Sequence, residues 1–154
     1  MKTEPEIKEK DAFTVVGLKY HGKAESDEIP QLWRNLMKYA DDVGSFVDFN
    51  AAYGVMGNYD VETGEYDYVA GWEKSREGEV PDDLTTWDVP TQTYAVFEVQ
   101  MNEITEAYEH IYNTWLPQSE YQHAAAPEFE YYDASFDPDD PTSTLYIYVP
   151  VMPI

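Results

Sequence analysis

A chain of 154 residues predicts a single domain, long enough to bury roughly two-thirds of its unfolded surface. Hydrophobic residues make up 43% of it and aromatic residues 16%, so it is expected to fold despite a formal net charge of −22. This charge, from 31 acidic and 9 basic residues, argues against direct nucleic-acid binding, and the absence of cysteine excludes disulfides, thiolate metal sites and thiol catalysis.

The N-terminal segment, residues 1–11, is charged and is expected to be frayed. It has no apolar stretch of the kind found in signal peptides, and no run elsewhere approaches the length of a membrane span. We therefore expect a cytoplasmic protein without membrane association. The acidity favours cationic partners through long-range attraction, although solubility or adaptation to salt would explain it equally well.

The remaining chain alternates between strand patterns of period two and helical patterns with apolar residues three and four positions apart. The first predicted helix covers residues 26–42, with Ser26 or Asp27 as its cap, and the second runs from a cap at Asn102 to about Leu116. In chain order the predicted elements are a strand at 12–20, the first helix, strands at 51–57 and 66–74, a polar loop at 75–90, a strand at 91–99, the second helix, and strands at 127–132 and 144–151.

The two predicted helices have the same register. Six apolar positions of the first, such as Leu36, match six of the second, such as Ile111, at a constant offset of 75 residues. Each helix follows one predicted strand and precedes two, which indicates a tandem β-α-β-β duplication with pseudo-repeats at about 12–75 and 91–154. We expect one α+β domain over 1–154, with a curved, mostly antiparallel sheet, two helices on one face and a central cleft.

Glu130 is the sharpest candidate for a functional residue. A strand here places Glu128, Glu130 and Tyr132 on one face and Phe129 and Tyr131 on the other. A carboxylate in such aromatic surroundings is costly to desolvate unless a cation accompanies it, and tyrosine rings attract organic cations. The alternative is that Glu130 faces solvent at a strand edge and has no function.

A set of aromatic residues is predicted to share one face of the sheet and to line a pocket. The helix-facing core is already supplied by Leu145, Ile147 and Val149, so this second face must cover something else. Ordinary core packing is the alternative. The set comprises Tyr66, Tyr68, Trp72, Tyr132, Tyr146 and Tyr148.

Patterns of common catalytic and metal sites are missing. The three histidines, His21, His110 and His123, lack metal-ligand spacing, and the sequence has no nucleophile-elbow, P-loop or dinucleotide-binding motif. No metal or other cofactor is expected. Acid–base chemistry by Glu130 with a tyrosine hydroxyl stays open.

Several short motifs recur in the order and spacing of one known family. The most specific pattern, P-x-F-E-x-Y, is formed by Pro127, Phe129, Glu130 and Tyr132, and a Y-V-P-V segment follows at 148–151. Over nearly its whole length the chain resembles the gyrase-inhibitor-like small-molecule-binding family, which includes effector-binding domains of AraC-type and MerR-type multidrug-responsive regulators. Earlier motifs of the resemblance are Val15-Val16-Gly17, Ile29-Pro30-Gln31-Leu32-Trp33, Tyr53-Gly54-Val55, Tyr68-Val69-Ala70-Gly71 and Thr93-Tyr94-Ala95-Val96-Phe97.

The resemblance implies a duplicated β-α-β-β fold with a central pocket for hydrophobic, often cationic or aromatic compounds. Regulators of the family carry a separate DNA-binding domain, which residues 1–11 are too few to form, so we expect a stand-alone module. Some members resemble hydrolases of strained electrophilic compounds. The family's pocket glutamate corresponds to Glu130, with pocket walls from Tyr53, Tyr68, Trp72, Tyr132 and Tyr146.

Three functions are therefore compatible with the sequence. The first is a binding protein for hydrophobic, cationic aromatic compounds, linked to transcriptional regulation or drug response. The second is a hydrolase of reactive small molecules with Glu130 as its base. The third is an acidic protein-interaction module of the gyrase-inhibitor type, whose partner the sequence does not identify. We expect binding rather than catalysis and assign no catalytic residue. If the protein is an enzyme, Glu130 is the expected catalytic residue.

Overall fold

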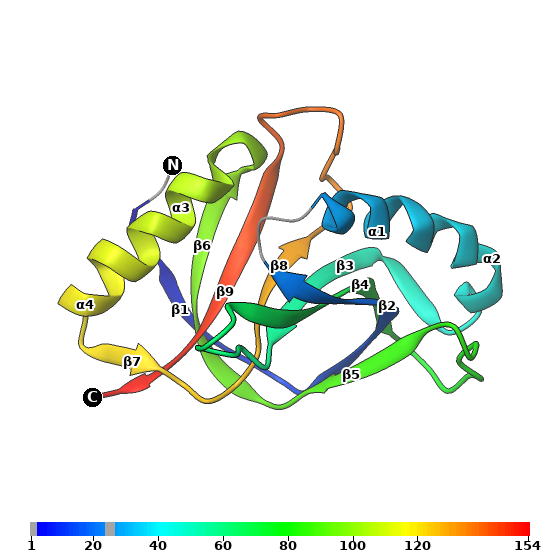
Figure 1. The fold of residues 1–154 in the computed structure, drawn as a ribbon, viewed down its shortest axis with the longest axis horizontal. Helices are drawn as coiled ribbons and strands as arrows, with labels where there is room; N and C mark the ends of the chain where they lie inside the picture. The colour runs from blue at the N-terminus through cyan, green and yellow to red at the C-terminus, as the bar shows by residue number, and fades with distance from the viewer. Residues whose placement is uncertain (1–2, 24–26) are drawn as a thin grey trace.

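The computed structural model describes residues 3–23 and 27–154 (Figure 1). In this part of the chain, nine strands and two helical regions are present, and the predicted α+β class is confirmed. No helix among these residues is both long and apolar enough to span a membrane. The elements are β1 (Glu6–Lys10), β2 (Phe13–Lys23), α1 (Glu28–Leu36), η1 (Met37–Tyr39), α2 (Ala40–Val43), β3 (Val47–Gly57), β4 (Glu65–Lys74), β5 (Thr85–Val89), β6 (Gln92–Gln100), η2 (Met101–Glu103), α3 (Ile104–His110), the π-helical turn η3 (Ile111–Trp115), α4 (Leu116–Gln118), β7 (Tyr121–His123), β8 (Glu128–Tyr132) and β9 (Thr144–Pro153).

The strand order confirms the tandem duplication. The sheet runs β1-β6-β9-β8-β3-β4-β2-β5, with β7 attached to β9, and every pair in it is antiparallel. From the centre outward the first half reads β3, β4, β2 and the second half reads β8, β9, β6, so each repeat places its three strands in the same order. Strands β3 and β8 meet at the centre, where the two halves join.

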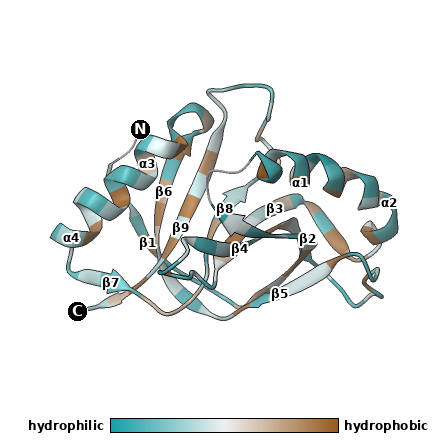
Figure 2. Ribbon diagram, viewed as in Figure 1, coloured by the Kyte–Doolittle hydropathy of each residue, from teal (hydrophilic) through white to brown (hydrophobic). Residues whose placement is uncertain are grey.

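Both helical regions cover the same side of the curved sheet (Figure 1). We call this side the helix face, and it carries Tyr68, Glu130 and Ile147. The other side, the opposite face, carries Tyr53 and Phe129. The helices are largely hydrophilic, whereas hydrophobic residues gather on the strands, as in β9 and β3 (Figure 2). The core is therefore built mainly from the sheet, and the helices seal one side of it.

Three strands were not predicted. Residues 6–10, expected to fray, form β1 and pair with β6 through backbone hydrogen bonds, although their side chains are mostly exposed. Within the predicted loop at 75–90, Thr85–Val89 forms β5 beside β2, and Trp87 packs in the cluster of the opposite face. The third, β7, has only three residues. Backbone pairing at a sheet edge requires no apolar pattern, so these short strands lack a clear sequence signal.

The second helical region differs from its prediction at both ends. Gln100 and Glu103 form a capping box at its start, rather than Asn102. Pro117 lies inside α4, directly after the π-helical turn, where a proline in the first turn is tolerated. In the first region, Asp27 occupies the cap position of α1 without a side-chain hydrogen bond, and Ser26 lies outside the described residues.

Candidate functional site

Glu130 lies in the middle of the sheet, on β8, and only 8% of it is exposed. Its Oε1 accepts hydrogen bonds from the hydroxyls of Tyr68 (3.2 Å) and Tyr132 (2.8 Å). Its Oε2 accepts one from the hydroxyl of Tyr108 (2.9 Å). The carboxylate is thus held by three neutral donors from β4, β8 and α3, and their side chains close over it.

Gly54 on β3 makes this arrangement possible. It lies opposite Glu130 in the β3–β8 register, and a Cβ there would come within 2.2 Å of the Tyr68 hydroxyl and 3.1 Å of Glu130 Oε1. Because glycine has no Cβ, the Tyr68 hydroxyl can cross the β3 backbone and reach the carboxylate. Trp33 on α1 donates its Nε1–H to the same hydroxyl (3.1 Å). Trp33 and Tyr108 are equivalent positions at the 75-residue offset, so both helices direct a polar aromatic edge at Glu130 or its partner.

A second buried carboxylate, Glu128, lies two residues before Glu130 on the same strand and is 5% exposed. It accepts hydrogen bonds from the hydroxyls of Tyr59 (2.9 Å) and Tyr112. Sequence reasoning placed Glu128 on this face but assigned it no role. The predicted pocket residues do not include Tyr59, Tyr108 or Tyr112. The Tyr-x-x-x-Tyr spacing, which puts both hydroxyls on one helix face, was the available signal.

The electrostatics of this cluster are unusual. Burial raises the pKa of Glu130; the three tyrosine hydrogen bonds lower it in part, and the charge of Glu128 raises it further. Burial and the charge of Glu130 raise the pKa values of Tyr68, Tyr108 and Tyr132 well above their usual range, so these hydroxyls remain donors. Among the described residues, neither carboxylate forms an ion pair with a Lys, Arg or His side chain.

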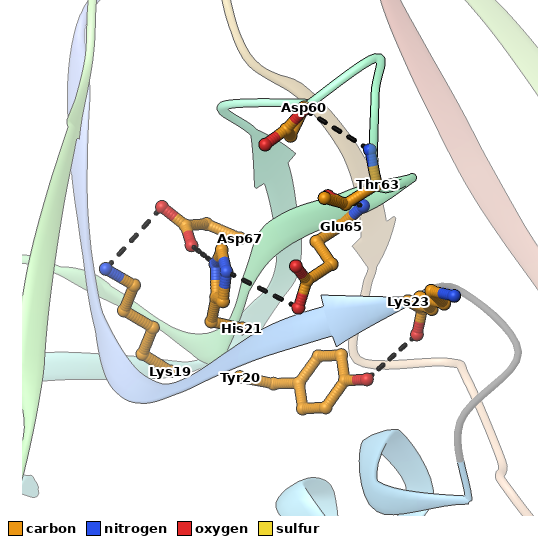
Figure 3. Close-up of polar contacts among 8 residues, drawn as sticks. All are labelled: Lys19, Tyr20, His21, Lys23, Asp60, Thr63, Glu65 and Asp67. Carbon is orange, nitrogen blue, oxygen red and sulfur yellow. Dashed lines mark hydrogen bonds and ion pairs between the residues drawn. The ribbon is translucent and has the colours of Figure 1, made fainter.

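Asp67 on β4 is another largely buried acid, but it has basic side chains beside it (Figure 3). His21 Nδ1 lies 2.7 Å from its Oδ1, Lys19 Nζ lies 3.5 Å from its Oδ2, and Asn58 donates to Oδ2 (2.9 Å). Burial alone would raise the pKa of Asp67, but these hydrogen bonds and the lysine charge bring it below its ordinary value. Asp67 is therefore compensated within the chain, in contrast to Glu128 and Glu130.

The structure brings together only part of the predicted set. Tyr68 and Tyr132 lie on the same face as Glu130 and donate hydrogen bonds to it. Trp72 is on the helix face but packs edge-on against Phe49, with ring centroids 4.9 Å apart. Tyr53 and Tyr146 lie on the opposite face.

The prediction that Tyr146 and Tyr148 share a face with Tyr68 is wrong because of strand register. Ile147 lies directly opposite Glu130 in the β8–β9 pair, and directly opposed residues share a face. The alternation within β9 was predicted correctly, but its registration against β8 is a tertiary property. The apolar residues of β9 lie on the helix face, as predicted, and its tyrosines lie on the opposite face. The misplaced residues are those predicted for the second face that lie on the helix face instead, namely Tyr66, Tyr68, Trp72 and Tyr132.

Two shallow hollows lie on the opposite face and share Tyr131 and Tyr148. One, of about 330 Å³, is lined by Tyr53 and Glu73, among others, and the other, of about 450 Å³, includes Tyr146 in its wall. Glu130 lines neither of them. In this structure the tyrosines pack directly on Glu130, so a ligand could reach it only after some of these side chains move.

Comparison with known proteins gives a consistent picture. The profile of the family described as Cass2, integron-associated effector binding protein, matches residues 6–151. Among curated proteins, the transcriptional regulator BrlR of Pseudomonas aeruginosa is 35% identical over 148 residues, which cover 94% of this chain. The chain spans about half of that regulator, 54% of its length.

Solved structures share the fold at low sequence identity. SAV2435 bound to tetraphenylphosphonium has a TM-score of 0.76 at 16% identity, with 97% of this chain and 94% of that chain covered. The C-terminal domain of EcmrR has a TM-score of 0.71 at 14% identity, with 98% of each chain covered. The integron cassette protein VCH_CASS2, from the mobile metagenome of Vibrio cholerae, has a TM-score of 0.66 at 18% identity, with 97% and 96% covered.

Proposed function

This chain belongs to the Cass2 family of integron-associated effector-binding proteins, and we propose that it binds hydrophobic, aromatic cations beside Glu130. The observation that carries the proposal is the burial of this carboxylate without a cationic partner in the described part of the chain. The similarity to the regulator BrlR supports a role of such binding in transcriptional regulation or drug response.

The physical reason is that an isolated buried charge is expensive. A carboxylate removed from water either acquires a partner or shifts toward its protonated form. Asp67 has acquired partners from its own chain, whereas Glu130 has only phenolic hydroxyls. An incoming cation would supply the missing charge, and the surrounding rings would add cation–π attraction of about 0.5–2 kcal/mol each.

The closed arrangement fits a site that opens on binding. Tyr68, Tyr108 and Tyr132 each hold Glu130 through a single hydroxyl hydrogen bond. Rotation of one ring would expose both the carboxylate and an aromatic face to the ligand. Trp33, whose ring lies edge-on to Tyr132 at 5.4 Å between centroids, would remain as a further wall.

Tetraphenylphosphonium, the compound bound to the structurally similar SAV2435, is a suitable probe. Tetraphenylborate, of similar shape and opposite charge, is its matched control. We expect the wild-type protein to bind the phosphonium and to reject the borate. Glu130→Gln should weaken phosphonium binding by about 1–3 kcal/mol, the range for a charge-assisted contact.

Glu62→Gln, on an exposed turn, removes the same charge from the protein and should leave the affinity nearly unchanged. Isothermal titration calorimetry of the two probes against wild type and both variants measures these differences. If Glu130→Gln bound the phosphonium as tightly as the wild type, the carboxylate would have no role in binding. The same conclusion would follow if the wild type bound the borate as tightly as the phosphonium.

A hydrolytic function has one observation in its favour. A carboxyl group with a raised pKa beside phenolic hydroxyls is the kind of group that acts as a general acid or base. Turnover of reactive esters or epoxides by the wild type, lost in Glu130→Gln with substrate binding retained, would establish catalysis. Binding of the phosphonium without turnover of any such compound supports the receptor function.

A further inference from the structure

Glu128 is a buried carboxylate that the proposed function leaves without a role. Only 5% of it is exposed, and its two oxygens accept hydrogen bonds from Tyr59 and Tyr112. Like Glu130, it has no ion pair within residues 3–23 and 27–154. The fold therefore buries two carboxyl groups close together on one strand and supplies neutral donors to both.

The two carboxylates and their tyrosines form a regular ladder. Glu128 and Glu130 are alternate residues of one strand, so their positions are about 7 Å apart. Tyr108 on α3 and Tyr112 in the π-helical turn are four residues apart, about one turn of the helix. Each tyrosine meets one carboxylate, Tyr112 with Glu128 and Tyr108 with Glu130. The two acids therefore face the same helical region and are bonded to it at two successive positions.

The exposed ring of the ladder lies at the Glu128 end, although Glu128 itself is as buried as Glu130. Tyr59, which bonds to it, is 53% exposed, and its ring stacks on Tyr66 with centroids 5.2 Å apart and planes 5° from parallel. A planar aromatic group could take a place in this stack. The ladder thus runs from an exposed aromatic edge at Glu128 to the enclosed carboxylate of Glu130.

A ligand with one charge would neutralise only one of the two acids and leave the other buried without a counter-charge. We propose that Glu128 and Glu130 together bind an elongated aromatic dication whose two positive charges are about 7 Å apart, the spacing of alternate strand residues. This inference rests on the proposed function, since it extends the same site, and it names the class of ligand that the site prefers.

A matched pair of compounds tests it. N,N′-dimethyl-4,4′-bipyridinium carries a charge at each end of two linked rings, and N-methyl-4-phenylpyridinium has nearly the same shape with one charge. At about 0.15 M salt, where long-range attraction is largely screened, the wild type should bind the dication on the order of tenfold to a hundredfold more tightly. The longer vinylene-bridged dication, with the same charge at a wider spacing, should lose most of that preference.

Substitutions then identify the residue that causes the preference for the dication. Glu128→Gln is nearly isosteric, and it should bring the affinities of dication and monocation within about threefold of each other, because the dication loses one of its two counter-charges. Glu130→Gln should weaken both compounds. Glu62→Gln, which removes one negative charge as Glu128→Gln does, should preserve the preference for the dication. Near-ultraviolet circular dichroism checks that each variant is folded.

The possible outcomes separate the two proposals. Equal wild-type affinity for the three compounds, or a Glu128→Gln variant that keeps the full dication preference, overturns the paired site even if Glu130→Gln still weakens binding. If Glu130→Gln changes neither affinity, the proposed function itself fails. The length dependence in the wild type needs no variant, so the inference is testable even if a substitution prevents folding.

Discussion

At the scale of single residues, the chain contains buried acids of two kinds. Asp67 has a histidine, a lysine and an amide within contact distance, and its pKa lies below the ordinary value. Glu130 has only hydroxyls, and its pKa lies above the ordinary value because burial outweighs those hydrogen bonds. The folded state therefore favours the ionised form of Asp67 and the protonated form of Glu130. Substitutions at the two sites should have opposite effects on stability.

Glu130→Gln should stabilise the ligand-free protein at pH 7, on the order of 1 kcal/mol, because it removes a charge that the fold accommodates poorly. A raised pKa contributes stability below the ordinary value and loses that contribution as the pH rises through the folded value. The advantage of the variant should therefore shrink as the pH falls toward 4. Urea unfolding of both proteins between pH 4 and 8 measures it, and a variant less stable than wild type at pH 7 would contradict the assignment.

Asp67→Asn should destabilise the protein at pH 7 by about 1–3 kcal/mol, the usual loss for a charged hydrogen-bond partner. A lowered pKa contributes stability above the ordinary value and loses it as the pH falls through the folded value. The cost of this substitution should thus disappear in acid. The same unfolding series provides the measurement, and an effect independent of pH would show that the ionised form is not favoured in the fold.

Tyr94 carries the only buried side-chain polar atom without a hydrogen-bond partner among the described residues. Its ring packs edge-on against Phe129 and Tyr148. Removal of an unsatisfied buried hydroxyl relieves a desolvation cost, so Tyr94→Phe should raise the free energy of unfolding by up to about 1 kcal/mol. Tyr53→Phe is the control, since its hydroxyl donates to Glu73 (2.7 Å) and its loss should destabilise. Thermal unfolding of the two variants measures these changes. A clear decrease in the free energy of unfolding of Tyr94→Phe would mean that this hydroxyl has a partner.

At the scale of elements, the central strands β3 and β8 position the site. Their register puts Gly54 opposite Glu130, and the missing Cβ admits the Tyr68 hydroxyl from β4. The alternation of residues 127–132 was enough to predict that Glu130 and Tyr132 share a face. It could not predict the faces of Tyr53 and Tyr146, because a one-residue shift in register moves every side chain of a strand to the other side.

Gly54→Ala should separate Tyr68 from Glu130. The added Cβ would overlap the Tyr68 hydroxyl, so the ring must move, at a cost of about 1–3 kcal/mol in stability. Phosphonium affinity should change as well, because the carboxylate loses one of its three donors. Gly44→Ala is the control, since Gly44 has a helical backbone conformation, and its effect should stay within about 1 kcal/mol. Denaturant unfolding and phosphonium titration of both variants give the comparison. Unchanged stability and phosphonium affinity in Gly54→Ala would contradict the proposal that the missing Cβ lets Tyr68 reach Glu130.

At the scale of the whole molecule, the sequence predicted the duplication because two amphipathic helices share one register over six positions. The strand order then follows the same plan in each half. The outer strands β1 and β5, one beside each half, were missed because pairing of their backbones, rather than a hydrophobic pattern, holds them. The tyrosine ladder was missed for a related reason. It joins β8 to the α3–η3 helix, and only the assembled sheet brings those elements together.

The net charge of −22 complicates any binding measurement, because it attracts every cation in solution. This long-range attraction is screened by salt, whereas a contact with a buried carboxylate is screened much less. The decisive measurement is the ratio of tetraphenylphosphonium affinities of wild type and Glu130→Gln, determined from low salt to about 1 M salt. We predict that both affinities change with salt while their ratio stays well above one throughout. A ratio that falls to one at high salt would contradict the buried counter-charge and leave only the surface charge of the protein to explain the binding.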